Sequence, residues 1–320
     1  MKDLLELRTI IDREMASLTY PQSPDLLYSP IRYITQLKAK RIRPLLVLIS
    51  YQIFDDDVER ALSPAIAIEL FHNFTLIHDD IMDNAPIRRG KPTVHEKWDN
   101  NAAILSGDVM MIQAYQLLAK VDINSSKEVF NVFSKAAVEV CEGQQLDIDF
   151  ESKNQIDITD YIKMIQNKTA VLLAASLKIG AIIAGAGKEE QDNLYDFGVN
   201  MGIAFQLKDD FLDVFGSPKV FGKQLGGDIL ANKKTFLYLK AIELADKPTK
   251  DWLEMIYSGN NVELKVSAVK EVFQKLNIEK YTMDMMKHYY ERAMSNLDLV
   301  MSDKKDLLIT FSDKLMDRVS

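Results

Sequence analysis

Apolar residues recur along the chain at the spacing of an α-helix. Leu70, Phe74, Ile77 and Ile81 are one example, because residues spaced by three or four positions share one face of a helix. Runs in which apolar and polar residues alternate, as in half-buried strands, are scarce. The pattern therefore predicts an all-α protein.

Residues that break helices are few and fall between the periodic segments. The 320 residues include 13 glycines and 9 prolines, below the average usage of about 7% and 5%. Breaker regions such as 86–92 and 216–227 separate segments of helical length, and none resembles a long Ser/Pro-rich linker. We predict a single domain, residues 1–320, built from ten or more helices.

Two glycines, Gly198 and Gly202, lie four residues apart inside one such segment. Each costs a helix about 1 kcal/mol relative to alanine. The close approach of a neighbouring helix would explain this cost, and a tolerated irregularity is the alternative.

Composition and charge narrow the classes of partner. The net charge of −8 argues against nucleic acid or an anionic membrane as a partner, since both require clustered cations on one face. The single cysteine, Cys141, cannot form an intramolecular disulfide. The first residues lack a signal-peptide pattern, and Lys178 interrupts the most apolar stretch, so we predict a cytoplasmic protein without a transmembrane segment.

Two DDxxD motifs place pairs of carboxylates on predicted helices. Asp79 and Asp83 lie one helical turn apart, as do Asp209 and Asp213, and like charges at this spacing destabilise a helix. One such motif could be a solvated helix end, but two copies on separate apolar helices favour a site for a divalent cation such as Mg²⁺. The predicted metal-binding residues are Asp79, Asp80, Asp83, Asp209, Asp210 and Asp213.

Other polar residues extend these motifs. His72 lies two turns before Asp79 on the same helix face, and Gln206 lies one turn before Asp209 and Asp210. Basic residues occur near both motifs, and arginine and lysine are suited to diphosphate oxygens, although each alone could be a solvated surface charge. The basic candidates are Lys40, Arg43, Arg88, Arg89, Lys168, Lys223 and Lys233.

The order of these motifs resembles that of the trans-isoprenyl diphosphate synthases, the polyprenyl synthetase family. The resemblance runs from about Lys38 to Thr235. Its markers are Lys40-Arg41-Ile42-Arg43-Pro44, the two aspartate motifs, Arg88-Arg89-Gly90, Lys168-Thr169-Ala170, Gly222-Lys223 and the run from Gly226-Gly227-Asp228 to Lys233.

The resemblance implies a helical bundle around a central cavity, a homodimer, and a prenyltransferase that condenses isopentenyl diphosphate with an allylic diphosphate. It implies that three Mg²⁺ ions bind at the two aspartate motifs. The residues implied to grip the allylic diphosphate are Arg88, Lys168, Lys223 and Lys233, with Thr169 and Gln206 beside the developing cation. Those implied to hold isopentenyl diphosphate are Lys40, Arg43, His72 and Arg89.

The chain departs from the family pattern at a few positions. Ala39 and Asn232 stand where the family usually has glycine, which leaves the local loop geometry and the choice between Lys233 and Lys234 open. No charged group that the chemistry needs is missing.

Product length depends on bulky residues before the first aspartate motif in this family. Phe74 and Phe71 lie five and eight residues before Asp79, with the small Thr75 also nearby. An aromatic residue at the fifth position and an uninterrupted motif resemble synthases of fifteen- or twenty-carbon products, with twenty favoured. A longer-chain synthase is the alternative, and both phenylalanines could instead be ordinary core or dimer-contact residues.

Three other functions compete with this interpretation. The pair His78-Asp79 resembles HD-type phosphohydrolases, but these need an upstream histidine that the chain lacks, so we expect His78 to be a hydrogen-bonded structural residue. A terpene cyclase would usually lack the second aspartate motif and the second basic pocket. A noncatalytic partner subunit of a heteromeric synthase would be expected to lose the carboxylates.

Overall fold

A computed structural model describes residues 1–153, 155–216, 226–258 and 265–316. Its internal contacts divide the chain into two compact units. Unit 1 comprises Met1–Lys135, Ala175–Tyr195 and Val300–Ile309, and unit 2 comprises Ala136–Ala174, Asp196–Leu299 and Thr310–Ser320. The prediction of a single domain stays a prediction. Lys223 lies outside the described residues.

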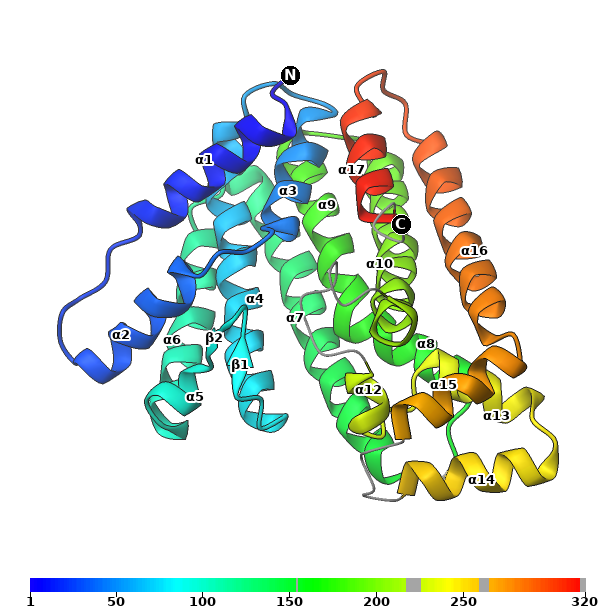
Figure 1. Cartoon of the computed structure of the whole chain (residues 1–320). Coiled ribbons are helices and arrows are strands. Elements are labelled where there is room, and N and C mark those ends of the chain that lie inside the picture. The colour runs from blue at the N-terminus through cyan, green and yellow to red at the C-terminus, as the bar shows by residue number, and fades with distance from the viewer. Residues whose placement is uncertain (154, 217–225, 259–264, 317–320) are drawn as a thin grey trace. The chain divides into compact units, whose positions relative to one another are not determined.

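Unit 1 contains the N-terminal helices and a short hairpin (Figure 1). Its complete elements are α1 (Leu4–Ser17), α2 (Asp25–Gln36), α3 (Ile42–Gln52), the 3₁₀ turn η1 (Val58–Ala61), α4 (Leu62–Met82), β1 (Ile87–Arg88), β2 (Lys91–Pro92), α5 (Val94–Lys97) and α6 (Asn100–Leu118).

Four helices contribute residues to both units: α7 (Ile123–Ser152), α9 (Val171–Ile183), α10 (Lys188–Phe215) and α17 (Asp306–Met316). The elements that belong to unit 2 alone are α8 (Ile158–Ile165), the π-helical turn η2 (Gln166–Ala170), α12 (Gly227–Leu230), α13 (Phe236–Leu244), α14 (Lys247–Ser258), α15 (Lys265–Lys275) and α16 (Ile278–Asp298).

The prediction of an all-α protein with ten or more helices is confirmed for the described residues. The two-residue strands β1 and β2 form an antiparallel hairpin in which Arg88 pairs with Lys91. The residues between them, Arg89 and Gly90, have φ angles of 53° and 73°. A two-residue hairpin turn of this kind needs positive φ at both positions, which explains the glycine at position 90. No described helix is long and apolar enough to cross a membrane.

Helix α4 forms the centre of unit 1 and packs against α3 and α6. Leu70, Phe74 and Ile77 of the predicted apolar face are buried. The helix ends where Asn84 adopts a left-handed conformation with φ 48°, and the Ala85 N–H donates to the Asp80 carbonyl at 2.9 Å. This arrangement is a Schellman-type helix end. It places the first aspartate motif in the last turn of α4.

A buried ion pair connects α4 to the start of α3. Arg41 has φ 52° and donates from Nη1 to Oε1 of Glu69 at 2.6 Å and from Nη2 to the Thr35 carbonyl at 2.8 Å. Glu69 is 1% exposed, and Asn73 donates to its backbone carbonyl at 2.7 Å. Because an unpaired buried charge is strongly destabilising, Glu69 holds Arg41 in the turn that precedes α3.

The close approach predicted for Gly202 is confirmed. A Cβ atom at this position on α10 would lie 2.5 Å from Cα and 2.6 Å from Cβ of Ala170. Gly198 is also buried. In unit 2, α10 therefore packs its backbone directly against the π-helical turn η2.

Candidate active site

The first aspartate motif gathers negative charge at the C-terminal end of α4. Asp80 is buried, Asp79 is half-buried and Asp83 is exposed. The carbonyl end of a helix carries a partial negative charge of its own. The local potential in unit 1 therefore favours a bound cation.

The hairpin supplies one counter-charge. Arg88 donates from Nε to both carboxylate oxygens of Asp80 at 2.8 Å, and its Nη2 lies 2.7 Å from Oδ1. Burial raises the pKa of Asp80 above its ordinary value, while the guanidinium of Arg88 opposes that shift. Arg88 is thus paired with the aspartate motif, and its predicted role in gripping a diphosphate stays a prediction.

A basic cluster in unit 1 is centred on Arg43, in the first turn of α3. The Nη1 atom of Arg43 donates to Nε2 of His72 at 3.0 Å. Burial lowers the pKa of Arg43 to about 10, with Glu69 acting in the opposite direction. Burial also lowers the pKa of His72 well below 6.5, and the positive charge of Arg43 adds to this effect. His72 is therefore a neutral acceptor in a strongly positive environment.

Two of the implied isopentenyl diphosphate ligands are thus brought together by the structure. Among the described residues, Nε of Arg43 is buried without a hydrogen-bond acceptor. Arg89 contributes to the electrostatic environment of both Arg43 and His72. Lys40 is exposed just before Arg41. A small polyanion would supply the acceptors that such a cluster favours.

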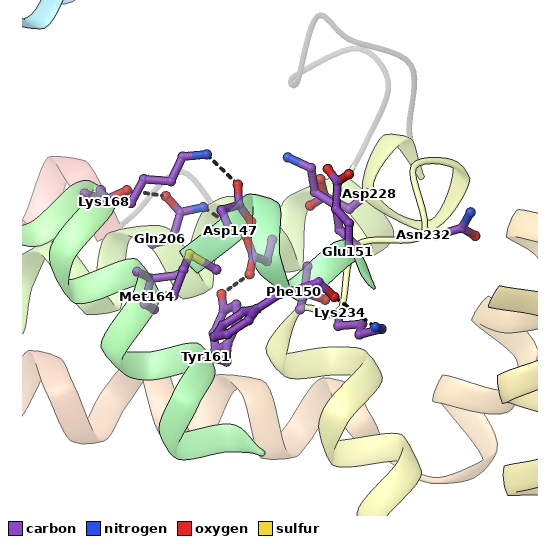
Figure 2. Close-up of a pocket in the computed structure, with 15 residues that line it drawn as sticks. Asp147, Phe150, Glu151, Tyr161, Met164, Lys168, Gln206, Asp228, Asn232 and Lys234 are labelled. Atoms are coloured by element: carbon purple, nitrogen blue, oxygen red, sulfur yellow. Dashed lines mark hydrogen bonds and ion pairs between the residues drawn. The ribbon is translucent and has the colours of Figure 1, made fainter. Parts of the chain in front are cut away.

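Unit 2 contains a pocket of about 130 Å³ around the second set of candidates (Figure 2). It brings together five predicted site residues, Lys168, Thr169, Gln206, Asp210 and Lys233. The other residues that line it are Asp147, Phe150, Glu151, Tyr161, Met164, Ile165, Asp228, Asn232, Lys234 and Thr235.

A chain of hydrogen bonds crosses this pocket. The Thr169 hydroxyl donates to Oε1 of Gln206 at 3.0 Å, and Nε2 of Gln206 donates to Oδ1 of Asp210 at 2.9 Å. The Tyr161 hydroxyl donates to the other oxygen of Asp210. Lys168 Nζ forms an ion pair with Asp147 at 2.5 Å, and Figure 2 shows these two side chains pointing toward each other.

Asp228 adds negative charge close to the second aspartate motif. Burial raises the pKa of Asp210 well above its ordinary value, and the negative charge of Asp228 adds to that shift. Asp213 accepts backbone N–H groups from Gly227 at 3.2 Å and Asp228 at 3.0 Å. Asp213 therefore fixes the start of α12 and holds Asp228 near Asp210.

One of the positions that depart from the family pattern, Asn232, has a structural explanation. Asn232 has φ 58°, and asparagine tolerates the left-handed region better than most residues other than glycine. Lys234 donates to the carbonyl oxygens of Phe150 and Lys153. Lys234 is therefore bonded to the backbone at the end of α7, and the role of Lys233 in binding a diphosphate stays a prediction.

The residues predicted to set product length are buried in unit 1. The ring of Phe74 lies 5.4 Å from that of Phe71, and Phe71 lies 5.2 Å from Phe133, measured between centroids. The Thr75 hydroxyl donates to the His72 carbonyl at 2.9 Å. The structure thus places Phe74 between the rings of Phe71 and His78, and its role in product length stays a prediction.

His78 lies in a packed environment between α4 and α6. The expectation for His78 is confirmed, because its Nε2 donates to the Ile104 carbonyl at 3.2 Å and its ring stacks edge-on against Phe74. Gly107 on α6 makes room for this ring, since a Cβ atom there would lie 2.4 Å from Nε2 of His78.

Sequence reasoning missed Asp147, Tyr161 and Glu69 as neighbours of the site residues. Asp147 and Tyr161 line the pocket, and Glu69 pairs with Arg41. Glu69 lies on the face of α4 that carries Asn73 and Asp80, and a carboxylate within so apolar a helix was a usable signal. Tyr161 has no comparable signal, since a tyrosine in an amphipathic helix is usually an ordinary core residue.

The donor set fits Mg²⁺ bound together with a diphosphate. The described residues contain no cluster of three His, Cys, Asp or Glu side chains that could hold a metal alone. Mg²⁺ typically takes one or two carboxylates and completes its shell with water and substrate phosphate. Pairs of aspartates at the ends of α4 and α10, with cations nearby, offer this type of site.

Comparison with known proteins identifies the family. The polyprenyl synthetase family model matches residues 24–276. A short chain isoprenyl diphosphate synthase of Methanocaldococcus jannaschii is 39% identical over 97% of this chain and 94% of its own length. A geranylgeranyl diphosphate synthase of Methanosarcina mazei is 34% identical over 96% and 94%.

Solved structures agree with the sequence comparison. A crystal structure of a geranylgeranyl pyrophosphate synthase superposes with a TM-score of 0.94 and 44% identity, covering 100% of both chains. The geranylgeranyl pyrophosphate synthetase of Pyrococcus horikoshii gives a TM-score of 0.90 at 36% identity, covering 97% of this chain and 95% of that one. The chain belongs to the polyprenyl synthetase family and has its helical fold. It is a prenyltransferase of the short-chain type.

The environment of His72 predicts how stability depends on pH. The unfolded chain takes up a proton on this residue below about pH 6.5, whereas the folded protein resists protonation because its pKa is lowered well below that value. Stability should therefore fall as the pH drops below about 6.5. Urea unfolding midpoints across this range should show a shallower pH dependence for His72→Gln. The idea is wrong if NMR shows the His72 ring becoming protonated near pH 6.5 in the folded protein.

Proposed function

We propose that this chain condenses isopentenyl diphosphate with an allylic diphosphate and makes geranylgeranyl diphosphate, the product named for several relatives. The observation that carries the proposal is the unit 2 pocket, where Lys168, Thr169, Gln206 and Asp210 converge on one space. The names of the relatives in Methanosarcina mazei and Pyrococcus horikoshii support the twenty-carbon product.

The pocket suits the departure of a diphosphate from an allylic carbon. When that carbon–oxygen bond breaks, both electrons leave with the diphosphate and a carbocation remains. Lys168 and Lys233 would stabilise the negative charge that develops on the leaving group. Mg²⁺, for which we propose three ions held by Asp79, Asp83 and Asp209 with their neighbouring aspartates, would stabilise the same charge when bound.

Thr169 and Gln206 would face the cation with oxygen atoms. The Thr169 hydroxyl donates to Gln206, and Gln206 in turn donates to Asp210. These bonds fix the orientation of both side chains, so their oxygen lone pairs need no rearrangement when charge develops. The double bond of isopentenyl diphosphate then attacks the cation, and loss of a proton completes the new allylic product.

The basic cluster of unit 1 would hold isopentenyl diphosphate without metal. Arg43 has a buried Nε–H without an acceptor among the described residues, and the neutral His72 ring supports its Nη1. Lys40 and Arg89 would add positive charge at the edge of this basic cluster. Because His72 stays neutral, it can donate only through the ring nitrogen that does not accept from Arg43.

The proposed reaction predicts the result of a direct assay. The purified chain with Mg²⁺, isopentenyl diphosphate and dimethylallyl diphosphate should release a twenty-carbon prenyl diphosphate. Asp79→Asn and Asp209→Asn should each lower kcat by about 100-fold or more, because each removes a charge that acts on the leaving group. Asp284→Asn, a matched change at an exposed position on α16, should leave the rate unchanged.

The same assay separates the competing functions. A chain that forms no elongated product alone, but does so when another subunit is added, would be a noncatalytic partner. Release of a hydrocarbon in place of a prenyl diphosphate would indicate a terpene cyclase. An elongated product that persists in both aspartate variants would contradict the assigned metal residues.

Product length provides a second prediction. Phe74→Ala would leave space between Phe71 and His78, and the growing chain should extend by at least one further five-carbon unit. Mass spectrometry of the products would measure this, with Phe197→Ala as a control that removes a buried ring from unit 2. An unchanged product length would exclude Phe74 as the floor. A wild-type product longer than twenty carbons is the alternative, since relatives named geranylfarnesyl diphosphate synthase are 31% and 34% identical.

We also propose a homodimer that forms through an apolar face of unit 1. The exposed fractions of Leu105 and Ile112 on α6 are 56% and 54%, and that of Phe130 on α7 is 46%. Tyr115 joins the two helices, because its ring stacks against Phe130 at 5.2 Å. Exposed apolar patches of this kind mark contact sites on soluble proteins, and a second copy offers the same apolar face. Separately from the interface, we propose that the protein is cytoplasmic.

The homodimer predicts the effect of a charge on this face. Ile112→Glu should convert the protein to a monomer in sedimentation equilibrium, because the interface would bury an unpaired carboxylate. Met255→Glu is the control, since Met255 is 59% exposed on α14. A monomeric wild-type protein, or a dimer that persists in Ile112→Glu, would contradict the proposed interface.

A further inference from the structure

Two glycines hold the backbone that carries Lys168 and Thr169. A Cβ atom at Gly143 on α7 would lie 2.2 Å from N and 2.6 Å from Cα of Lys168. At Gly202 on α10, the corresponding atom would lie 2.5 Å from Cα of Ala170. No side chain fits at these separations, so both helices approach the π-helical turn η2 as bare backbone.

A polar residue stands one helical turn after each glycine and contacts the same turn. Asp147, four residues after Gly143, forms the ion pair with Lys168. Gln206, four residues after Gly202, accepts the hydrogen bond from Thr169. Residues i and i+4 share one face of a helix. Each helix therefore contacts η2 twice, once through glycine backbone and once through a polar side chain.

The rare conformation of η2 suggests that this double contact has a functional role. Residues 166–170 form a π-helical turn, a rare conformation that is found mostly at functional sites. Within the turn, Asn167 and Ala170 are 2% and 0% exposed, whereas Lys168 and Thr169 line the pocket. Lys168 and Gln206 both line the pocket drawn in Figure 2.

We propose that Gly143 with Asp147, and Gly202 with Gln206, act as two clamps that set the positions of Lys168 and Thr169. Gly143, Asp147 and Gly202 are thus positioning residues for ionisation of the allylic substrate. This inference rests on the proposed function of Lys168 and Thr169. A methyl group at either glycine pushes η2 away. The side chains of Lys168 and Thr169 are then displaced but still present.

Another glycine shows what a purely structural close contact looks like. Gly180 on α9 lies in unit 1, where a Cβ atom would meet the Val47 carbonyl oxygen at 2.2 Å. Its approach is as tight as that of Gly143, but Val47 does not line the pocket. Gly180→Ala is therefore a matched control for loss of packing.

The experiment compares Gly143→Ala and Gly202→Ala with Gly180→Ala in the homogeneous, folded protein. Thermal unfolding measures stability, and steady-state kinetics give kcat and the KM for isopentenyl diphosphate. Both pocket variants should lower kcat by about ten-fold or more while that KM changes by less than about two-fold, because the transition state loses stabilisation. Gly180→Ala should lose similar stability and keep its kcat.

A double-mutant cycle with Lys168→Met provides a readout that a structural defect would not change. If Gly143 acts through Lys168, then Gly143→Ala should lower kcat far less in the Lys168→Met background than in the wild type. Asp147→Asn adds no heavy atoms and should show the same dependence on Lys168, so it replaces Gly143→Ala if that variant does not fold.

The outcomes separate a failure of the proposed clamps from a failure of the proposed function of Lys168. Full activity of Lys168→Met would overturn the role proposed for Lys168. A Lys168→Met variant with strongly reduced but measurable activity, combined with unchanged kcat in Gly143→Ala or Asp147→Asn, would overturn the clamp alone. Equal effects of Gly143→Ala in both backgrounds would also overturn it, since the loss would then not pass through Lys168.

Discussion

The structure depends on neutralising buried charges next to the ends of apolar helices. Asp80 is buried at the end of α4 and takes its counter-charge from Arg88 of the hairpin. Arg41 is buried before α3 and takes its counter-charge from Glu69. Unit 1 thus neutralises part of its charge internally, and in unit 2 the ion pair between Lys168 and Asp147 does the same. What remains is a set of carboxylates and cations whose balance is completed by Mg²⁺ and diphosphate in the proposed reaction.

Backbone conformations that few residues tolerate hold these charges in place. Asn84 ends α4 directly after the first aspartate motif, and Arg89 with Gly90 forms the turn that presents Arg88. Asn232 shapes the loop before Lys233, and the π-helical turn η2 presents Lys168 and Thr169. These positions lie beside the proposed chemistry. Such conformations persist only where the surrounding structure compensates for their cost.

Much of the fold could be predicted because helix formation here follows local pattern. The face of Leu70, Phe74 and Ile77 is buried in α4, and Gly202 makes the close contact that its cost inside a helix implied. The hairpin was not predicted, because a two-residue strand is too short to show alternation. The partners Asp147 and Tyr161 were missed because their contacts join α7 and α8 to residues 21 and 49 positions away.

The sequence by itself determined the class of chemistry. The two aspartate motifs, the ordered basic residues and the apolar periodicity are local features, and local spacing fixes which side chains share a helix face. Only the tertiary structure decided which charges are already paired, that His72 is neutral, and that Lys168 and Thr169 occupy a π-helical turn clamped at Gly143 and Gly202. Those properties depend on burial and on contacts between segments distant in the chain, which no local pattern encodes.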